Sequence, residues 1–173
     1  MSVSIPAMLR LFLLRHAKAE PAGGKLEDHE RPLNARGRAD SRRMGELCLE
    51  RGYTASRVLC STSLRTRQTW EGLSFSWGKK KPKVEFQRAL YLAAWPALLA
   101  VVKTAPEKTQ SLMLIGHNPG IEQLAFALAL KPKTPPERTR LEAMAAKYPT
   151  AALAVLDFDG AWKDAAAGAF QLT

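Results

Sequence analysis

The chain has 173 residues, of which 46% are hydrophobic and 24% are charged, and its formal net charge is +10. This length and composition predict one globular domain over residues 1–173, and no apolar stretch is long enough to span a membrane. The excess of 26 Lys and Arg over 16 Asp and Glu favours an anionic partner, such as a phosphate group.

The two densest basic clusters do not have the pattern of a nucleic-acid surface. Four arginines fall in one predicted helix, and three lysines fall in a loop flanked by proline. Neither cluster is interleaved with the aromatic residues on which single-stranded bases stack. We therefore expect no nucleic-acid partner, and the lysine loop could either steer a substrate or only keep the protein soluble. The clusters are Arg36, Arg38, Arg42 and Arg43, and Lys79, Lys80 and Lys81.

The cysteines and the N-terminal stretch indicate a cytoplasmic protein. Cys48 and Cys60 lack the spacing of a metal site and are expected to be buried thiols in a reducing compartment. The apolar stretch over residues 5–14 is interrupted by Arg10, and it lacks the basic start and small-residue cleavage site of a signal peptide.

The first predicted strand, residues 9–14, is an apolar run that ends abruptly in Arg15 and His16. Open α/β folds keep their sites at the carboxyl ends of strands, so this pair could clamp an anion beside a nucleophile. Lys18 adds a further positive charge nearby. Taken alone, a histidine after an apolar run is more often a packed or surface residue than a catalyst.

A polar loop is predicted over residues 19–32, where it would hang over the end of the first strand. His29 could bind a metal there together with Asp28 and Glu30. Three consecutive side chains cannot easily converge on one ion, and an exposed polar loop explains them equally well. We therefore expect no metal site.

Asn34 is expected to cap the first helix, which would end near Arg51 and Gly52. The apolar stripe of this helix would consist of Met44, Leu47 and Leu49.

Residues 57–61 predict a second buried strand, and Thr62 or Ser63 can cap a helix that begins near Leu64. Arg65 falls in the first turn of that helix, where a cation and the free backbone N–H groups can meet one anion. The competing interpretation is that Arg65 and Arg67 are ordinary surface arginines.

The rest of the chain continues the alternation of strands and helices. Gly116 and His117 follow the cleanest strand, and Pro119 would occupy the first position of the next helix. This alternation predicts an α/β fold with a mainly parallel sheet. The predicted elements are a loop at 72–82, strands at 83–86, 112–115 and 151–158, helices at 95–103, 121–130 and 138–147, a loop at 131–137, a turn at 160–162, and an edge strand within 168–173.

Three strand ends could therefore converge on one pocket that holds His16, His117, Arg15 and Arg65. Two guanidinium groups match a phosphoryl dianion, and a neutral imidazole is a good nucleophile toward phosphorus. A second imidazole, as a cation, could neutralise the equatorial oxygens. The glycine-rich dinucleotide motif and the Walker loop are both missing from the sequence.

The motifs at these strand ends resemble those of the histidine phosphatase superfamily, the phosphoglycerate mutase-like group. Leu14-Arg15-His16-Ala17 is similar to its Arg-His-Gly signature, with Ala17 in place of glycine. Residues 61–69 resemble its Ser-Pro-x-x-Arg-Ala-x-Gln-Thr segment, with Thr62 in place of proline. Residues 116–119 resemble its second histidine motif, and residues 31–37 resemble the stretch that opens the first helix. The short length is similar to that of SixA-type phosphohistidine phosphatases.

The resemblance implies a three-layer α/β/α fold and a reaction in which His16 becomes phosphorylated. Arg15, Arg65 and His117 would complete the catalytic pocket, and Arg15, Arg65, Ser61 and Asn118 would bind the substrate. Water would then release inorganic phosphate from the phosphohistidine. No metal or organic cofactor is implied.

The sequence departs from the family pattern at the proton donor. Many phosphoester-cleaving relatives have a carboxylate after the third strand, whereas residues 88–93 contain no acid. An alkoxide leaving group needs a proton in the transition state, but an imidazole needs far less help. This favours phosphohistidine over sugar phosphates. Four acids could still reach the pocket, namely Glu20, Asp28, Glu30 and Glu85.

Three functions stay open at this point. The leading hypothesis is a phosphatase that acts on phosphohistidine in a protein. The second is a phosphatase for small-molecule phosphoesters, and the third is a noncatalytic protein that binds polyanions. A mutase is less favoured, since nothing obvious would retain a bisphosphorylated intermediate. The partner would accordingly be a phosphorylated protein or a small phosphorylated substrate.

Overall fold

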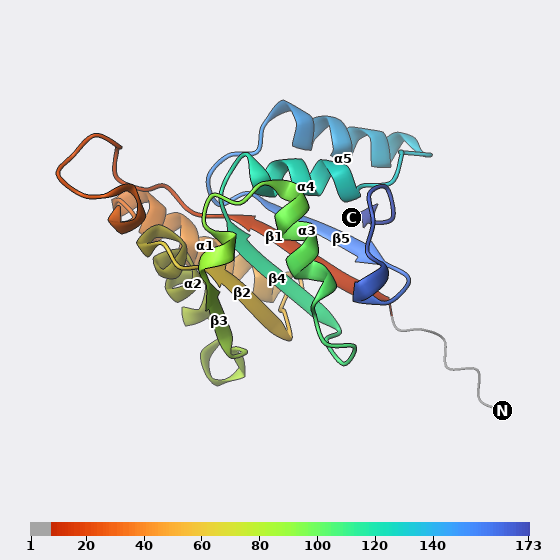
Figure 1. Ribbon diagram of the computed structural model, residues 1–173, viewed down its shortest axis with the longest axis horizontal. Coiled ribbons are helices and arrows are strands. Elements are labelled where there is room, and N and C mark those ends of the chain that lie inside the picture. Colours follow the sequence, from red (N-terminus) through yellow and green to blue (C-terminus); the bar gives the residue numbers. More distant parts are fainter. Residues whose placement is uncertain (1–7) are drawn as a thin grey trace.

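The computed structural model describes residues 8–173, so the beginning of the apolar stretch at 5–14 lies outside the described residues. A six-stranded sheet forms the centre, in the order β3-β2-β4-β1-β5-β6 (Figure 1). The first four of these strands are parallel, whereas β5 runs antiparallel to both β1 and β6. The strands are β1 Leu9–Arg15, β2 Arg57–Ser61, β3 Val84–Gln87, β4 Ser111–Gly116, β5 Leu153–Phe158 and β6 Gln171–Leu172.

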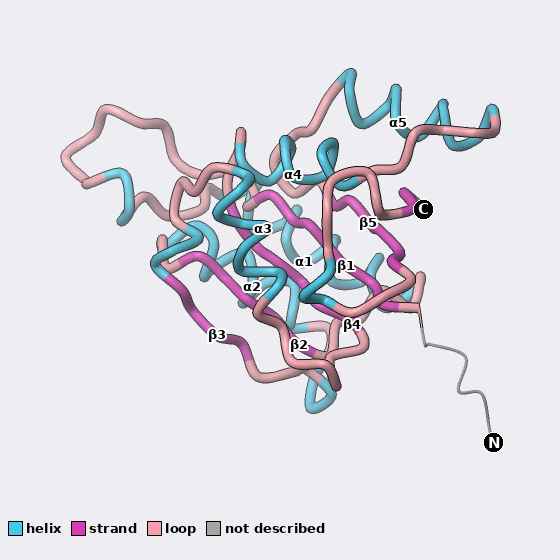
Figure 2. The backbone as a smooth tube through the Cα atoms, turned by 45° about the vertical axis from the view of Figure 1, so that its right-hand side comes forward, coloured by secondary structure: helices cyan, strands magenta, loops and turns pink. Residues whose placement is uncertain are grey.

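Helices cover both faces of the sheet and complete the three-layer α/β/α architecture (Figures 1 and 2). On one face lie α1 (Ala35–Glu50) and α2 (Leu64–Phe75), and on the other lie α3 (Trp95–Lys103) and α4 (Gly120–Leu128). A fifth helix, α5 (Pro135–Ala146), lies beyond α4, near β6. The expected α/β fold with a mainly parallel sheet is confirmed.

The strand side chains alternate between two hydrophobic clusters, as the period of two in a strand requires. In β1, Leu11 and Leu13 pack toward α3 and α4, whereas Phe12 and Leu14 pack toward α1 and α2. All four are fully buried. A strand that is apolar on both faces can only be central, which explains the continuous apolar run before Arg15.

Most of the expected element boundaries agree with the structure to within one or two residues. Asn34 caps α1 by accepting a hydrogen bond from the Gly37 backbone, and Ser63 caps α2 by accepting one from Thr66. Both cysteines are buried free thiols. The expected edge strand near the C-terminus is β6.

Three expectations about the helices are wrong. The expected apolar stripe of α1 is wrong at Leu49, which is 44% exposed, whereas Met44 packs partly buried against the core and the fully buried residues of the helix are small. Helix α2 continues to Phe75, through the start of the loop expected at 72–82. Helix α5 begins at Pro135 rather than Arg138, because Thr134 and Glu137 form a capping box. The small buried residues of α1 are Gly37, Ser41, Gly45 and Cys48.

Smaller differences concern Pro119 and the lysine loop. Pro119 is the capping residue of α4 rather than its first residue, and the helix ends at Leu128. Two of the three lysines of the predicted loop, Lys79 and Lys80, lie in a short 3-10 turn, Gly78–Lys80.

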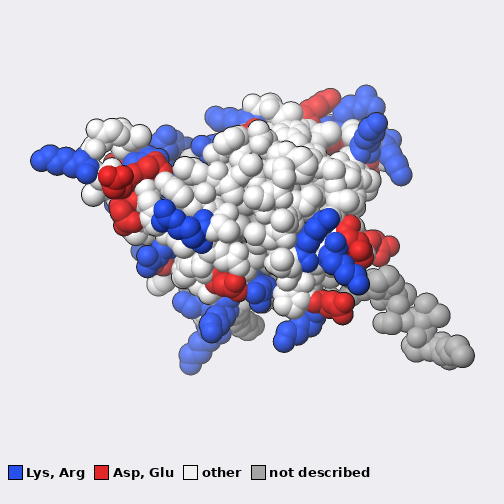
Figure 3. All heavy atoms as spheres, in the orientation of Figure 1, with Lys and Arg blue, Asp and Glu red and all other residues white. Residues whose placement is uncertain are grey.

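The surface charges are spread rather than gathered into one stripe on the face shown in Figure 3. On this face Lys and Arg are interspersed with Asp and Glu around the rim, while the centre is uncharged. Among residues 8–173, no helix is long and apolar enough to cross a membrane.

The small residues of α1 let α2 approach closely, and this contact can be tested at Gly45. A Cβ atom at this position would clash with the backbone carbonyl of Leu73 in α2. We expect Gly45→Ala to lower the free energy of unfolding by about 1–3 kcal/mol in a denaturant titration. Gly24→Ala is the matched control, because a Cβ there meets nothing within 4 Å. Equal stability of the two variants would contradict this packing.

Candidate active site

The two strand-end histidines lie side by side because β1 and β4 are adjacent and parallel. Arg15 pairs with Gly116 in the register, and the next amide, that of His16, donates to the Gly116 carbonyl at 3.0 Å. His16 and His117 therefore leave the sheet together. Their ring centroids are 5.2 Å apart, with an angle of 59° between the rings.

The two arginines reach the same place from different elements. Arg65 comes from the first turn of α2 and is only 2% exposed, which excludes the surface interpretation. Its Nη2 lies 3.4 Å from Nδ1 of His117. Arg15 ends β1, and its Nη1 donates to the carbonyl of Tyr148 at 2.8 Å. Arg67, by contrast, is exposed.

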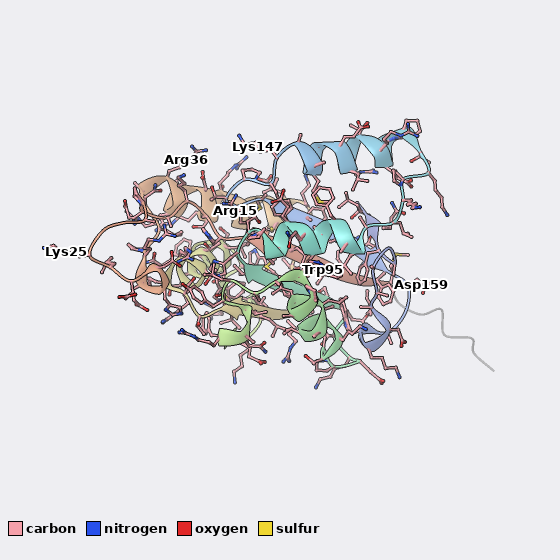
Figure 4. The ribbon with its side chains drawn as sticks, turned by 45° about the horizontal axis from the view of Figure 1, so that its top comes forward. Arg15, Lys25, Arg36, Trp95, Lys147 and Asp159 are labelled. Carbon is pink, nitrogen blue, oxygen red and sulfur yellow. The ribbon has the colours of Figure 1, made fainter. Side chains whose placement is uncertain are left out.

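These side chains line a pocket of about 350 Å³ at the carboxyl end of the parallel strands. Figure 4 shows Arg15 near the end of β1, and Lys25 at the outer tip of the loop that follows this strand. The lining thus combines four arginine and lysine side chains with one carboxylate. The residues are Arg15, His16, Lys18, Ala19, Asp28, Arg31, Arg65, Leu92, His117, Asn118 and Thr150.

His16 is held in the form that a nucleophile needs. Its Nδ1 lies 2.7 Å from the carbonyl oxygen of Ala17, and a carbonyl can only accept, so Nδ1 carries the proton. The lone pair is therefore on Nε2. Burial, assisted by the nearby charges of Arg65 and Arg15, lowers the pKa of His16 to about 4. The ring is accordingly neutral at pH 7.

His117 has the opposite tautomer. Its Nδ1 faces the guanidinium of Arg65, which can only donate, so the proton lies on Nε2 and is donated to Oγ of Ser61 at 2.8 Å. Burial and the neighbouring His16 ring lower the pKa of His117 to about 3. A phosphoryl dianion in the pocket would counteract both effects and favour the cation.

Two buried guanidinium donors in this region have no hydrogen-bond partner within residues 8–173. They are the Nε atoms of Arg15 and Arg65. Buried donors are rarely left unpaired in proteins, and such groups often mark a functional site. Phosphoryl oxygens are strong acceptors that would satisfy guanidinium donors of this kind.

Of the four candidate acids, only Asp28 reaches the pocket. Glu20 is exposed, Glu30 pairs with His29, and Glu85 pairs with Arg57 outside the pocket lining. Asp28 accepts hydrogen bonds from Tyr91, Arg31 and Arg65, with the Tyr91 bond at 2.6 Å. These bonds hold the pKa of the Asp28 carboxyl well below its usual range. Asp28 is therefore ionised at neutral pH and is a poor proton donor.

Two of the expected substrate-binding residues are turned toward other protein groups. Ser61 is fully buried, and its hydroxyl bonds to His117 rather than lining the pocket. Asn118 lines the pocket, but its Nδ2 donates to Glu122 at 2.8 Å and to the Tyr148 carbonyl at 3.3 Å. Their contribution to substrate binding stays a prediction.

The sequence interpretation missed two tyrosines. The ring of Tyr91 packs edge-on against His117, with centroids 5.4 Å apart, and Tyr148 holds Arg15 through its backbone carbonyl. Tyr91 follows β3, which is the next parallel strand, so the logic of converging strand ends could have identified it. The carbonyl of Tyr148 carries no side-chain signal that a sequence pattern could reveal.

Both ring nitrogens of His29 bond to protein groups. Its Nδ1 pairs with Glu30 at 2.7 Å, and its Nε2 bonds to the Thr62 hydroxyl at 2.9 Å. Among the residues that the structure describes, no group of three or more His, Cys, Asp or Glu side chains could hold a metal ion.

Comparison with known proteins matches this chain to one protein family. The sequence model of the histidine phosphatase superfamily (branch 1) matches residues 11–91. An uncharacterized protein of Mycobacterium tuberculosis is 30% identical over 159 residues, which cover 92% of this chain and 96% of that protein.

Two solved structures share both sequence and fold with this chain. A candidate phosphohistidine phosphatase SixA from Agrobacterium tumefaciens is 32% identical, with a TM-score of 0.75 over 87% of this chain and 92% of that one. A candidate SixA from Nakamurella multipartitia is 27% identical, with a TM-score of 0.78 over 96% and 94%.

The lowered pKa values of His16 and His117 can be tested by NMR titration of the free protein. We expect the ring signals of both to titrate below pH 5, with midpoints near 4 and 3. An unfolded histidine binds its proton near pH 6.5, so the unfolded chain takes up more protons than the folded chain below that pH. The free energy of unfolding should therefore fall as the pH drops from 6.5 toward 4. A midpoint at or above pH 6 for either ring would contradict this electrostatic picture.

Proposed function

Because this chain belongs to the histidine phosphatase superfamily and is a phosphatase, we propose that its nucleophile is His16 and its substrate is phosphohistidine in a protein. The observation that carries the proposal is the pairing of two neutral, buried imidazoles with two arginines around one pocket. The candidate SixA phosphatases at 27% and 32% identity support the choice of substrate.

In the first step, the lone pair on Nε2 of His16 attacks phosphorus, and the bond from phosphorus to the leaving group breaks. Arg15, Arg65 and His117 bind the phosphoryl oxygens, whose charge they neutralise in the transition state. The phosphorylated His16 ring keeps its Nδ1 proton, which stays on the Ala17 carbonyl. The ring is then a cation, which is a good leaving group.

In the second step, water attacks phosphorus and the bond to Nε2 of His16 breaks. The electron pair returns to Nε2, which restores the neutral imidazole, and inorganic phosphate leaves. Every group that this sequence of steps uses belongs to the chain itself or to water.

Phosphohistidine fits the pocket better than an ordinary phosphoester for a chemical reason. An alkoxide leaving group needs a proton donor, and the one carboxyl among the pocket-lining residues, Asp28, is held ionised. An imidazole ring that already carries a proton on its distal nitrogen leaves as a neutral group without such a donor. The small-phosphoester alternative therefore has less support, and membership of a phosphatase superfamily leaves no ground for the noncatalytic polyanion-binding alternative.

Removal of the proposed nucleophile tests the mechanism. We expect His16→Asn to lower kcat at least about 10³-fold on any phosphorylated substrate that the protein hydrolyses, because the variant lacks the lone pair that attacks phosphorus. His29→Asn is the matched control, since His29 lies outside the pocket lining and should retain activity. Turnover by His16→Asn at the wild-type rate would refute His16 as nucleophile.

A substrate panel tests the leaving-group argument. We expect kcat/KM for a phosphohistidine peptide to exceed that for sugar and nucleotide phosphates at least about 100-fold, in line with the usual benefit of a general acid. The comparison uses initial rates of phosphate release at pH 7. Comparable values for the alkyl phosphates would favour the small-phosphoester function instead.

A further inference from the structure

Arg65 already binds a carboxylate at the mouth of the pocket. Its Nη2 lies 2.9 Å from Oδ2 of Asp28, and its Nη1 donates to the Asp28 backbone carbonyl. Tyr91 donates to the same Oδ2, and Arg31 donates to Oδ1 at 2.7 Å. Asp28 is thus held by three side chains that come from its own loop, from α2 and from the segment after β3.

This carboxylate is a fixed negative charge in a pocket that is otherwise built for an anion. Its side chain is 45% exposed and lines the pocket, so a ligand can reach it, although Arg31 (through both Nε and Nη2), Arg65 and Tyr91 already donate to its oxygens. A negative charge beside a phosphoryl dianion opposes binding. The charge is not needed to hold Arg65 alone, because the backbone carbonyl of Asp28 also accepts from that guanidinium.

We propose, on the basis of the function inferred above, that Asp28 determines specificity by accepting a hydrogen bond from the distal ring N–H of the substrate phosphohistidine. The carboxylate then favours the imidazolium form of the phosphorylated substrate ring, which leaves as a neutral imidazole when the P–N bond breaks. Asp28 repels leaving groups that carry extra negative charge, such as carboxylates or further phosphates.

The bond changes show why that proton matters. When Nε2 of His16 forms its bond to phosphorus, the P–N bond to the substrate ring breaks and its electron pair goes to the ring nitrogen. With a proton on the distal nitrogen, the product is a neutral imidazole. Without that proton the product would be an imidazolate, which is a far worse leaving group. A carboxylate that binds the distal N–H therefore raises the reactive fraction of the substrate.

The proposed nucleophile, His16, also has an acceptor for the N–H of its distal ring nitrogen. Nδ1–H of His16 donates to the Ala17 carbonyl at 2.7 Å, so the ring stays protonated there when Nε2 carries the phosphoryl. The phosphoryl would then pass between two imidazoles whose distal N–H groups each have an acceptor. These acceptors are the Ala17 carbonyl on one side and the Asp28 carboxylate on the other.

The experiment compares two substrates that differ in the leaving group. The leaving group of a phosphohistidine peptide is an imidazole with a distal N–H. The leaving group of p-nitrophenyl phosphate is a phenolate, which has no such N–H. We expect Asp28→Asn to lower the ratio of their kcat/KM values at least about tenfold, as the loss of a charge-assisted hydrogen bond predicts. Asp28→Glu, which keeps the carboxylate, should retain more of this preference. Asp40→Asn is the matched control, since Asp40 pairs with Arg36 on α1.

The outcomes separate this inference from the proposed function. If wild-type protein hydrolyses p-nitrophenyl phosphate but not the phosphohistidine peptide, the proposed substrate is wrong. If the wild type hydrolyses both and Asp28→Asn slows both by the same factor, Asp28 only orients Arg65 and this inference is overturned.

A second measurement covers the case in which Asp28→Asn does not fold, as judged by thermal unfolding. Wild-type protein is assayed on phosphoimidazole and on its N-methyl cation, which lacks the distal N–H. We expect the rate enhancement over the uncatalysed reaction to be at least about tenfold smaller for the methylated substrate. Equal enhancements would overturn the inference.

Discussion

The site depends on the parallel pairing of β1 with β4. The hydrogen bond from the His16 amide to the Gly116 carbonyl is the last one of this ladder, and it brings His16 level with His117. A slip of one residue would turn the alternating side chains of β1 to the opposite faces. Leu11, Phe12, Leu13 and Leu14 are all fully buried, so the two packed faces of the sheet fix this register. The hydrophobic core therefore sets the distance between the two imidazoles.

Burial has a second effect at the same place, since it keeps both imidazoles neutral. A cationic imidazole would have no lone pair for phosphorus, and His16 lies beside Arg15 and Arg65, which oppose its protonation. The same arginines supply the positive charge that a phosphoryl group needs. The pocket thus combines a neutral nucleophile with a cationic binding site, which are two requirements that would conflict in water.

Sequence patterns predicted most of this architecture because the decisive signals are local. Apolar runs followed by Arg15, Ser61 and His117 marked the strand ends, and Asn34 and Ser63 marked the helix starts. The face of α1 was predicted wrongly because its close approach to α2 selects small residues such as Gly45, and hydrophobic periodicity does not report such an approach. The role of Asp28 could not be assigned because it depends on where the long loop after β1 folds back. That position is fixed by contacts between residues more than 30 positions apart.

The most direct test of the central claim is to identify the residue that carries phosphate during turnover. Protein that is hydrolysing a phosphohistidine peptide is quenched without acid, digested and analysed by mass spectrometry. The geometry described above predicts phosphate on His16, with the modification disappearing once the substrate is consumed. Phosphate on His117 or His29, or active turnover with no phosphorylated histidine, would contradict it.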